Sequence, residues 1–389
     1  MLNKFLSRKL SEIRDFRLLR TLNTIQSNPT KTIQIDGRKF INFSSNNYLD
    51  IAGNREIEAK IVNSIEKYGF AGTSSRLICG NLLIHEKLET ALAAFKNKQA
   101  SLVFPSGYQT NVGVISALMS NEKESCIIID KLNHASLWDG AKLSGVRIFV
   151  YEHCDMNSLE KVLQRTREYR MKLVITESIF SMDGDFTPLK DFTILCQRYD
   201  AVSMVDEAHS IGVFGKEGKG LAEFFDVENK IDIIVGTLSK AFAVQGGFVC
   251  GSRKLIDFLI NKSRAFIYTT AVSPIICAAA LKSLEIIKKS DDKRQYLHTL
   301  SKALKNKLNS LGFNTLNTQS QIIPILTGSI ENTAKISASL LKKGIYTPAI
   351  KAPTVQDKSR IRISLTSGHT IEDIEKLCDN IRLIPQNIV

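Results

Sequence analysis

The segment Gly236–Gly247 contains a lysine that is placed for covalent chemistry. The apolar run Ile231–Val235 predicts a short buried strand, so Thr237, Ser239 and Lys240 follow its end, where open parallel sheets bind ligands. A free lysine has a pKa near 10.4 and is a poor nucleophile at neutral pH, so an ordinary solvated loop residue is the simplest alternative. In a partly desolvated cleft, however, Lys240 could lose its proton and form a Schiff base with an aldehyde. The two hydroxyl groups could then hold an anionic group such as a phosphate.

Four other predicted strands are each followed at once by a polar turn. These turns are Pro105–Asn111, Asp130–His134, Glu177–Gly184 and Asp206–Gly212. The first turn enters a predicted helix, whose free N–H groups could hold a phosphate. Because the carboxyl ends of parallel strands meet at one edge of a sheet, we expect these turns and Lys240 to converge.

Three side chains in these turns could act on one aromatic ring. Asp206 directly follows an apolar strand, where a carboxylate is costly unless it is paired. It could cap a helix or meet a structural arginine, or it could hold a protonated pyridine nitrogen and keep the ring an electron sink. His209 could be an ordinary loop histidine or could reach the phenolic oxygen of the same ring. His134 could cap a helix that begins near Ala135, or stack on the ring.

Strands and helices alternate through the middle of the chain, and this alternation must position the polar turns. The predicted strands are Ala100–Phe104, Cys126–Ile129, Arg147–Tyr151, Lys172–Thr176, Val202–Val205, Ile231–Val235 and Phe248–Cys250. The segments between them, such as Asn157–Tyr169 and Leu189–Tyr199, have helical spacing. The pattern predicts an α/β fold: a large domain with a mostly parallel sheet flanked by helices.

Other elements are expected on both sides of this alternation. Before it we predict an amphipathic first helix carrying Phe5, Leu6, Leu10, Ile13 and Leu22, a hairpin over Lys31–Phe43 around Asp36-Gly37, helices over Arg55–Tyr68 and His85–Phe95, and an irregular functional loop over Gly69–Asn81. After it we predict a long helical stretch over Ile275–Leu311, strands over Gln321–Thr327, Ile345–Ile350 and Ser359–Leu365, and a helix over Ile371–Arg382. We therefore expect an N-terminal segment (1–45), the large domain (46–285) and a small C-terminal α+β domain (286–389).

Composition limits the classes of function. The chain has 389 residues and a formal net charge of +13, but its lysines are scattered, so a nucleic-acid-binding tail is not indicated. Its seven cysteines include no CxxC pair, which predicts neither a disulfide framework nor a metal site and suits a reducing cytoplasm. No secretory signal or membrane-spanning run is evident. The positive charge is compatible with an anionic small-molecule substrate or carrier.

The motifs in combination resemble a known family. Thr-Leu-Ser-Lys240-Ala-Phe and Asp206-Glu-Ala-His209 are similar to the fold type I pyridoxal-phosphate (PLP) enzymes. The ordered motifs Asn-Tyr-Leu, Ser-Arg-Leu-Ile-Cys-Gly-Asn, Ser-Gly-Tyr, Asn-His-Ala-Ser, Phe-Ser-Met-Asp-Gly-Asp and Ile-Tyr-Thr-Thr resemble the α-oxoamine synthases. These enzymes condense an amino acid with an acyl thioester and release CO2. The resemblance extends over about residues 15 to 385 and implies PLP as the cofactor.

The resemblance also implies roles for individual residues. Lys240 would be the Schiff-base lysine and the base that removes the substrate α-proton, Asp206 would hold the pyridinium nitrogen, His209 would hold the phenolic oxygen, and His134 would stack on the ring and contact the substrate. The positions that match cofactor or phosphate contacts are Gly107, Tyr108, Ser181 and Thr237, to which Ser239 adds the second hydroxyl noted above. Thr270 matches a phosphate contact made from the other subunit of a homodimer. Arg362 matches the residue that binds the amino-acid carboxylate, a task suited to a guanidinium group.

Within this family, the segments Ala352–Val355 and Arg360–Thr366 and the start near Arg20 most resemble the members that join alanine to a pimeloyl thioester in biotin biosynthesis. On that interpretation Arg20 and Thr354 contact the substrate, whose carrier is CoA or an acyl carrier protein. The chain departs from the usual family pattern at five places, which are Asp50, Phe70-Ala71, Cys154, Ala243 and Lys351. Glycine is usual at positions 50 and 243, and asparagine at position 154.

Several alternatives stay open at this point. The chain could be another α-oxoamine synthase, such as a 2-amino-3-oxobutyrate CoA ligase, a serine palmitoyltransferase or an autoinducer synthase. It could also be a non-catalytic basic protein that binds nucleic acid, although its motifs argue for an enzyme. A dinucleotide-binding fold and a P-loop are not supported, because neither GxGxxG nor GxxxxGK[ST] is present.

Overall fold

The computed structural model describes residues 1–120, 123–351, 354–355 and 359–383. The chain divides into two compact units. Unit 1 comprises Met1–Asn46, Met182–Gly184 and Tyr296–Val389, and unit 2 comprises Asn47–Ser181 and Asp185–Gln295. Each unit is described by itself.

Unit 2 is built on a seven-stranded sheet with the order β3-β9-β8-β7-β6-β4-β5. Its strands are β3 (Ala100–Phe104), β4 (Ser125–Asp130), β5 (Arg147–Tyr151), β6 (Met171–Glu177), β7 (Val202–Asp206), β8 (Ile233–Thr237) and β9 (Gly247–Gly251). The ladders among β5, β4, β6, β7 and β8 are parallel, and β9 pairs antiparallel with both β8 and β3. The predicted α/β fold with a mostly parallel sheet is confirmed.

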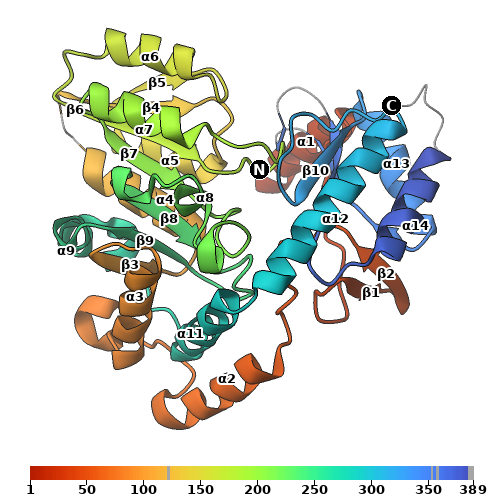
Figure 1. The fold of residues 1–389 in the computed structure, drawn as a ribbon, viewed down its shortest axis with the longest axis horizontal. Coiled ribbons are helices and arrows are strands. Elements are labelled where there is room, and N and C mark those ends of the chain that lie inside the picture. Colours follow the sequence, from red (N-terminus) through yellow and green to blue (C-terminus); the bar gives the residue numbers. More distant parts are fainter. Residues whose placement is uncertain (121–122, 352–353, 356–358, 384–389) are drawn as a thin grey trace. The chain divides into compact units, whose positions relative to one another are not determined.

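Side chains that alternate along the strands pack into two apolar cores, one on each face of the sheet. Leu102 and Val249 join the core that contains residues of α4, α5, α9 and α10. Their neighbours Val103 and Phe248 join the other core, with residues of α2, α3 and α11. Helices therefore cover both faces, as Figure 1 shows. This arrangement explains why the strands read as continuous apolar runs.

The helices of unit 2 lie mainly between successive strands. They are α2 (Arg55–Tyr68), α3 (Leu83–Phe95), α4 (Gly107–Met119), α5 (Ala135–Ser144), α6 (Met156–Arg165), α7 (Leu189–Arg198), α8 (Leu221–Phe224), α9 (Arg253–Lys262), α10 (Arg264–Ile267) and α11 (Pro274–Lys288). Short 3-10 turns occupy Lys216–Gly218 and Glu228–Lys230. Predicted helix ends agree closely with these bounds for α2, α3 and α7.

Unit 1 is an α+β assembly with two small sheets, of order β1-β2-β11 and β10-β13-β12. Its strands are β1 (Thr32–Ile35), β2 (Arg38–Asn42), β10 (Ile322–Leu326), β11 (Ile345–Tyr346), β12 (Ala349–Ile350) and β13 (Arg360–Ser364), and its helices are α1 (Leu2–Asp15), α13 (Ile330–Lys342) and α14 (Ile371–Arg382). Helix α12 (Asp291–Ser310) begins in unit 2 and continues in unit 1. The predicted hairpin is confirmed, with both turn residues, Asp36 and Gly37, at positive φ.

Several sequence-based expectations need correction. The helical stretch over Ile275–Leu311 is two helices, because α11 ends at Lys288 and α12 begins at Asp291. The expected strand over Ile345–Ile350 is two short strands, β11 and β12, that pair in different sheets. The first helix ends at Asp15, so Leu22 lies outside it. The loop expected to be irregular contains one π-helical turn, Arg76–Gly80.

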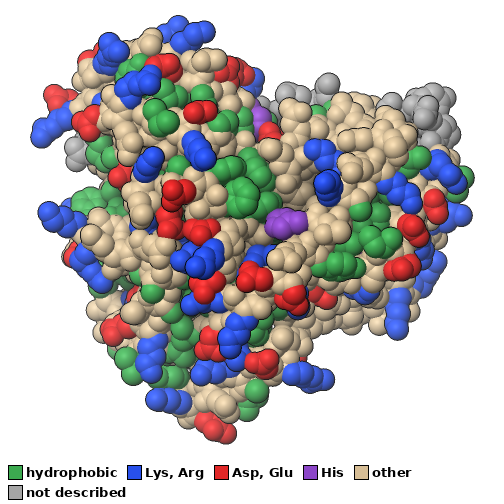
Figure 2. Space-filling model, viewed as in Figure 1, with side chains coloured by type: hydrophobic (Ala, Val, Ile, Leu, Met, Phe, Trp, Pro, Cys, Tyr) green, Lys and Arg blue, Asp and Glu red, His purple; other side chains and the backbone are tan. Residues whose placement is uncertain are grey.

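On the face shown in Figure 2, Lys and Arg side chains are interspersed with Asp and Glu, despite the net charge of +13. Among the described residues, no helix has both the length and the hydropathy needed to cross a membrane.

Candidate active site

Lys240 lies on a loop that joins two paired strands. β8 and β9 pair antiparallel up to Thr237 and Gly247, and the N–H of Leu238 donates to the carbonyl of Gly246 at 2.9 Å. The Lys240 amine lies 2.9 Å from Nε2 of His209, and Nδ1 of that ring lies 2.6 Å from the hydroxyl of Tyr48. Tyr48 and His209 are both buried. The Lys240 amine is thus held in place by His209, and Tyr48 holds His209 in turn.

A second set of polar side chains surrounds Asp206 at the end of β7. The Asn111 side-chain amide, on α4, donates to Oδ2 of Asp206 at 2.8 Å and to the hydroxyl of Ser136 at 2.9 Å. The other carboxylate oxygen, Oδ1, accepts from the N–H of Ala208 at 2.9 Å. The Ser136 hydroxyl in turn lies 2.7 Å from Nδ1 of His134. The Asp206 carboxylate is therefore fixed by neutral donors, and within the described residues it has no cationic side chain within 4 Å.

His134 is placed between these two sets of side chains. It caps α5, since its Nδ1 accepts from the N–H of Ser136, so the capping role considered from the sequence is present. Burial lowers the pKa of His134, the charge of Asp206 raises it and that of Lys240 lowers it. A buried imidazole with a lowered pKa is neutral at physiological pH. Both Asp206 and Lys240 are thus close enough to act on the same ring.

Glu177, at the end of β6, belongs to the same group of residues. Its side chain accepts a hydrogen bond of 2.6 Å from the N–H of His134, and it lies opposite Asp206 in the register of β6 and β7. Burial raises the pKa of Glu177 well above its ordinary value; the Asp206 charge raises it further, and Lys240 acts in the other direction. Burial thus disfavours the charged form of this carboxyl group, which accepts from the backbone of His134.

A cradle of small residues lies between the start of α4 and the end of β8. The hydroxyls of Thr237 and Ser239 are 2.7 Å apart, and a Cβ on Gly107 would lie 3.3 Å from Cβ and Oγ1 of Thr237. A Cβ on Gly247 would lie 2.6 Å from the backbone N of Gly107. Glycine is therefore required for this close approach, which brings hydroxyls to the N-terminus of a 13-residue helix.

The remaining predicted residues of unit 2 are more peripheral. Tyr108 is half-exposed and donates to Asp139 at 2.5 Å. Ser181 is partly buried in the loop after β6, and Thr270 is exposed beyond α10. Their predicted contacts with the cofactor stay predictions.

The predicted substrate residues belong to unit 1. The Arg20 guanidinium donates to the Thr354 hydroxyl at 2.9 Å, so two residues far apart in the sequence are brought together as a pair. Arg362, on β13, is buried and donates to Oδ1 of Asn46 at 3.2 Å. Of the motif Ala352–Val355, residues 352 and 353 lie outside the described residues.

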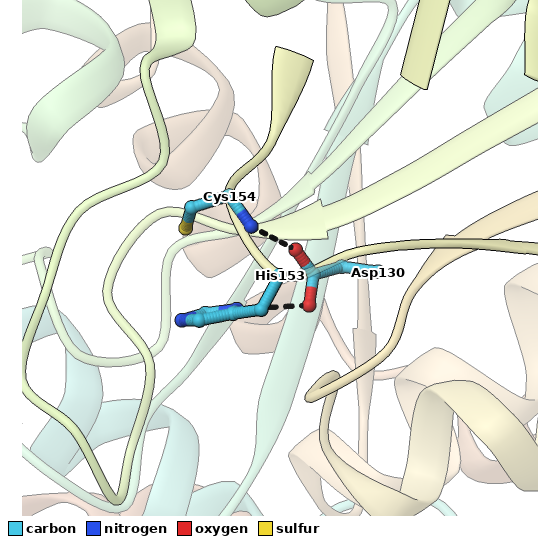
Figure 3. Close-up of side chains that lie close together, drawn as sticks. All are labelled: Asp130, His153 and Cys154. Carbon is cyan, nitrogen blue, oxygen red and sulfur yellow. Dashed lines mark hydrogen bonds and ion pairs between the residues drawn. The ribbon is translucent and has the colours of Figure 1, made fainter. Parts of the chain in front are cut away.

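A histidine near the ends of β4 and β5 bridges two carboxylates, and Figure 3 shows its contact with one of them, Asp130. Nδ1 of His153 lies 3.0 Å from Asp130, and Nε2 lies 2.9 Å from Asp185. The ligand atoms of Asp130, His153 and Cys154 lie within 4.8 Å of one another, so this group has the donor types of a metal site. Because both ring nitrogens already bind carboxylates, we interpret the group as a structural imidazolium that anchors the loop containing Asp185.

Three of the departures from the family pattern share one backbone property. Asp50, Cys154 and Ala243 have φ values of 50°, 52° and 56°, in the left-handed region. Glycine and asparagine adopt this region most readily, which explains why they are usual at these positions. In this chain an aspartate, a cysteine and an alanine adopt the left-handed region at these positions.

The residues gathered in unit 2 fit the predicted cofactor. A ring with an aldehyde, a basic nitrogen and a phosphate needs an amine, a buried carboxylate and an anion cradle, which Lys240, Asp206 and the Gly107–Thr237 approach would supply. In addition, Oδ1 of Asn111 is buried and, within the described residues, has no hydrogen-bond partner. A buried acceptor without a partner is rare, and one beside Asp206 is expected where a polar ligand would donate the missing hydrogen bond.

Sequence reasoning missed three residues of this site. Tyr48 lies in the quoted Asn-Tyr-Leu motif, and Asn111 and Glu177 lie within two of the polar turns, but none was singled out. Glu177 immediately follows a strand, the same signal that identified Asp206. Nothing in the sequence shows that Asn111 points from α4 toward β7.

Comparisons with known proteins agree with this geometry. A family model described as aminotransferase class I and II matches residues 38–381. The 8-amino-7-oxononanoate synthase of Thermoanaerobacter pseudethanolicus is 40% identical over 373 residues, which cover 95% of this chain and 94% of that protein. The 8-amino-7-oxononanoate synthase 2 of Bacillus subtilis is 40% identical over 388 residues, which cover 100% and 99%.

Solved structures give the same result. A serine palmitoyltransferase from S. paucimobilis with bound PLP and myriocin has a TM-score of 0.92 and 28% identity, and the match covers 100% of this chain and 99% of that chain. The 8-amino-7-oxononanoate synthase from Francisella tularensis has a TM-score of 0.77 and 28% identity, covering 88% and 97%. The resemblance to α-oxoamine synthases and the predicted cofactor, PLP, are confirmed. The chain belongs to the aminotransferase class I and II family, in which it is a PLP-dependent acyltransferase of the 8-amino-7-oxononanoate synthase group.

Proposed function

We propose that the protein condenses L-alanine with a pimeloyl thioester to give 8-amino-7-oxononanoate, CO2 and the free carrier, a step of biotin biosynthesis. The observation that carries this proposal is the 2.9 Å contact between the Lys240 amine and Nε2 of His209, beside the fixed Asp206 carboxylate. This amine and this carboxylate are the groups that PLP chemistry needs. The relatives at 40% identity support the choice of reaction.

Residue roles follow from the contacts around Lys240 and Asp206. When bound, PLP supplies an electron sink for the pair of electrons left by removal of the amino acid's α-proton. Lys240 takes that proton at Nζ and later returns one, while His209, which contacts the Lys240 amine, would hold the phenolic oxygen of the bound ring. Asp206 keeps the ring nitrogen protonated, and Asn111 and the Ala208 N–H fix the orientation of its carboxylate. His134, neutral because of its burial, orients the substrate.

The substrate's anionic groups are assigned to residues of unit 1. Arg362 binds the amino-acid carboxylate, which leaves as CO2, because a buried guanidinium matches a carboxylate in shape and charge. Arg20 and Thr354 contact the acyl chain. Their mutual hydrogen bond supports a shared task.

The working enzyme is a cytoplasmic homodimer in this proposal. The segment after Gly69 and the segment around Ala271 pack together, since the Ala271 N–H donates to the Ser74 carbonyl at 2.9 Å. Both segments expose apolar side chains, with Phe70 71%, Ile78 80% and Tyr268 72% exposed. Exposed apolar groups of this size are typical of an interface. Thr270, in the second segment, would then contact the phosphate of the cofactor bound to the partner subunit.

Mixed dimers test this arrangement. Lys240→Ala and Thr270→Ala proteins, each of low activity, are mixed, unfolded and refolded together. If Thr270 acts in the partner's site, a mixed dimer contains one site without either lesion, and activity rises above the sum of the two parents. Additive activity, or a monomer by sedimentation, would contradict the proposal.

The reaction itself is tested with a matrix of substrates. Purified holoenzyme is given alanine, serine or glycine with pimeloyl-CoA, pimeloyl-acyl carrier protein, acetyl-CoA or palmitoyl-CoA, and products are identified by mass. The proposal expects the alanine and pimeloyl pair to have the highest kcat/KM. A higher kcat/KM for another pair of substrates would contradict the proposed reaction.

A serine palmitoyltransferase is the second candidate, because the TM-score of 0.92 to such an enzyme exceeds the 0.77 to an 8-amino-7-oxononanoate synthase. The identity of 40% to proteins named as the synthase outweighs this, since it exceeds the 28% to the palmitoyltransferase. A higher kcat/KM for serine with palmitoyl-CoA in the same matrix would favour the palmitoyltransferase over the synthase.

A further inference from the structure

A groove of about 520 Å³ lies in unit 2, away from the candidate active site. It is lined by Arg167, Glu168, Tyr169, Arg170, Lys172, Arg198, Tyr199 and Asp200, and we call it the basic groove. These residues come from the segment between α6 and β6, the start of β6, the end of α7 and the turn between α7 and β7. Its volume is within the range of small-molecule sites.

The basic groove and the active-site residues lie at opposite ends of the same strands. Lys172 is near the beginning of β6, and Glu177 is at its end. Five residues of extended chain separate them, which amounts to about 17 Å at 3.3 Å per residue. The basic groove is therefore a separate site.

Lys172 is the residue that most needs a ligand. It is 5% exposed, and its amine donates to the Tyr169 carbonyl at 2.9 Å. Within the part of the chain that the structure describes, the Lys172 amine has no carboxylate within ion-pair distance. A buried ammonium without a counter-ion is costly, because a carbonyl replaces only part of its hydration. An anion in the basic groove would supply the missing charge.

The other charged residues of the basic groove do not neutralise the charge of Lys172. Arg198 is paired with Glu160 at 2.9 Å, and Arg167 lies over the ring of Tyr199 at 5.4 Å. Arg170 is exposed, and among the described residues its side chain forms no ion pair. Glu168 and Asp200 also line the groove and oppose anion binding, but neither lies within ion-pair distance of a described cation. Because Glu160 neutralises Arg198, three basic and two acidic residues of the lining remain, which leaves a small excess of positive charge.

The two tyrosines provide flat apolar surface beside these charges. Tyr169 packs edge-on against Phe149, with ring centroids 5.7 Å apart. The Tyr199 hydroxyl donates to Glu160 at 3.0 Å, which fixes the second ring. Both rings are partly exposed in the groove. Fixed aromatic rings next to cations suit a ligand that combines a planar ring with a phosphate.

We propose that the basic groove binds a phosphorylated small molecule of nucleotide size, with its phosphate at Lys172 and Arg170 and its planar part beside the tyrosines. This binding is independent of the reaction proposed above. It gives the protein a second ligand site, at the edge of the sheet opposite the reaction.

The test is calorimetric titration of the PLP-loaded protein with AMP, ATP and inorganic phosphate at low and moderate salt. Lys172→Met removes the charge and keeps the length of the side chain, and Arg170→Ala alters an exposed position, so both variants should fold. Arg55→Ala, on α2 and 93% exposed, removes a surface charge elsewhere and is the matched control.

We expect AMP or ATP to bind the unaltered protein, each groove variant to weaken that binding at least tenfold, and Arg55→Ala to change it less than twofold. Affinity that falls with salt also supports the proposal. No binding at ligand concentrations up to about 1 mM, or binding that all three variants retain, would overturn it. The retained binding would place the nucleotide at another site, such as one for a CoA substrate. Activity of the variants is measured separately, so failure here leaves the proposed reaction untouched.

Discussion

The side-chain amine of Lys240 lies 2.9 Å from Nε2 of His209. The same imidazole contacts the Tyr48 hydroxyl at 2.6 Å through Nδ1. If the amine donates to Nε2, Nδ1 must carry the proton and donate to Tyr48. A donating lysine therefore fixes the tautomer of His209, and Tyr48 supplies the acceptor for the Nδ1 proton.

Tyr48→Phe should lower kcat by about tenfold and leave the fold intact, because it removes one buried hydrogen-bond partner and keeps the ring. The pH profile of kcat should also move, since Nδ1 of His209 loses its hydrogen-bond partner. Tyr296→Phe is the control, because Tyr296, on α12, is exposed and has no part in the candidate site or the proposed interface. Unchanged kcat and pH profile in Tyr48→Phe would remove Tyr48 from the site.

Asp206→Asn should still bind PLP but should lower kcat by roughly a hundredfold or more, since the carboxylate that keeps the ring nitrogen protonated is lost. Visible absorbance measures the bound cofactor, and product formation measures turnover. The exposed Asp257→Asn, on α9, is the control and should behave as the unaltered protein. Full turnover in Asp206→Asn would refute the assigned role.

The contribution of His153 to stability should fall as pH rises. Burial alone would lower its pKa, but hydrogen bonds to Asp130 and Asp185 raise it to about 12. The pKa in the folded protein is thus above the value of about 6.5 expected in the unfolded chain. The stabilisation is complete below about pH 6.5 and is lost progressively toward pH 12, by up to about 1.4 kcal/mol per pH unit. Urea midpoints of the unaltered protein and His153→Gln, compared from pH 5.5 to 9, should converge at high pH. A gap that widens with pH would contradict the assignment.

Ala243→Gly should raise stability by about 1 kcal/mol, because Ala243 has a φ of 56° and a Cβ is unfavourable there. Asp50→Gly is the matched comparison and should gain less. Aspartate tolerates this region, and Oδ1 of Asp50 accepts from Asn47 at 3.4 Å. Thermal midpoints of the holoenzymes measure both, and an equal or smaller gain at Ala243 would argue against backbone strain.

Lys96→Met should destabilise unit 2 by about 3–5 kcal/mol, because it leaves the Glu207 carboxylate buried without its cation. Lys96 donates to Glu207 at 2.5 Å, and both side chains are fully buried. The double variant Lys96→Met/Glu207→Gln should recover part of the loss, since no charge remains buried. Denaturation midpoints distinguish the two, and a double variant less stable than Lys96→Met would show that the pair is not the cause.

The sequence predicted the sheet well, because buried parallel strands leave long apolar runs and polar ends. It placed β8 two residues early, at Ile231 instead of Ile233. At residues 231 and 232, hydrogen bonds to side chains take the place of strand pairing. The Ser203 N–H donates to the Asp232 carboxylate at 2.8 Å, and the Lys98 amine donates to the Ile231 carbonyl at 2.6 Å. The apolar pattern of a segment does not reveal hydrogen bonds of this kind, which come from side chains elsewhere in the sequence.

Breaks within regular segments were harder to predict. Pro348 lies between β11 and β12. Because proline lacks an N–H, it is the residue of this segment that indicates a break in strand pairing. Ser290 precedes two aspartates at the start of α12, which is a common helix start. Partners such as Asn111 and Asp206 are 95 residues apart, so only the fold reveals their contact.

The antiparallel pairing of β9 with β8 means that Lys240 stands at the tip of a hairpin rather than at the entrance to a helix. Leu238, Ala241 and Phe242 of the same connection are buried, and Leu238 and Phe242 belong to the apolar core on one face of the sheet. Inserting or deleting one residue between positions 238 and 246 would therefore displace core side chains together with the nucleophile. The position of the amine is thus set by the packing of the domain interior.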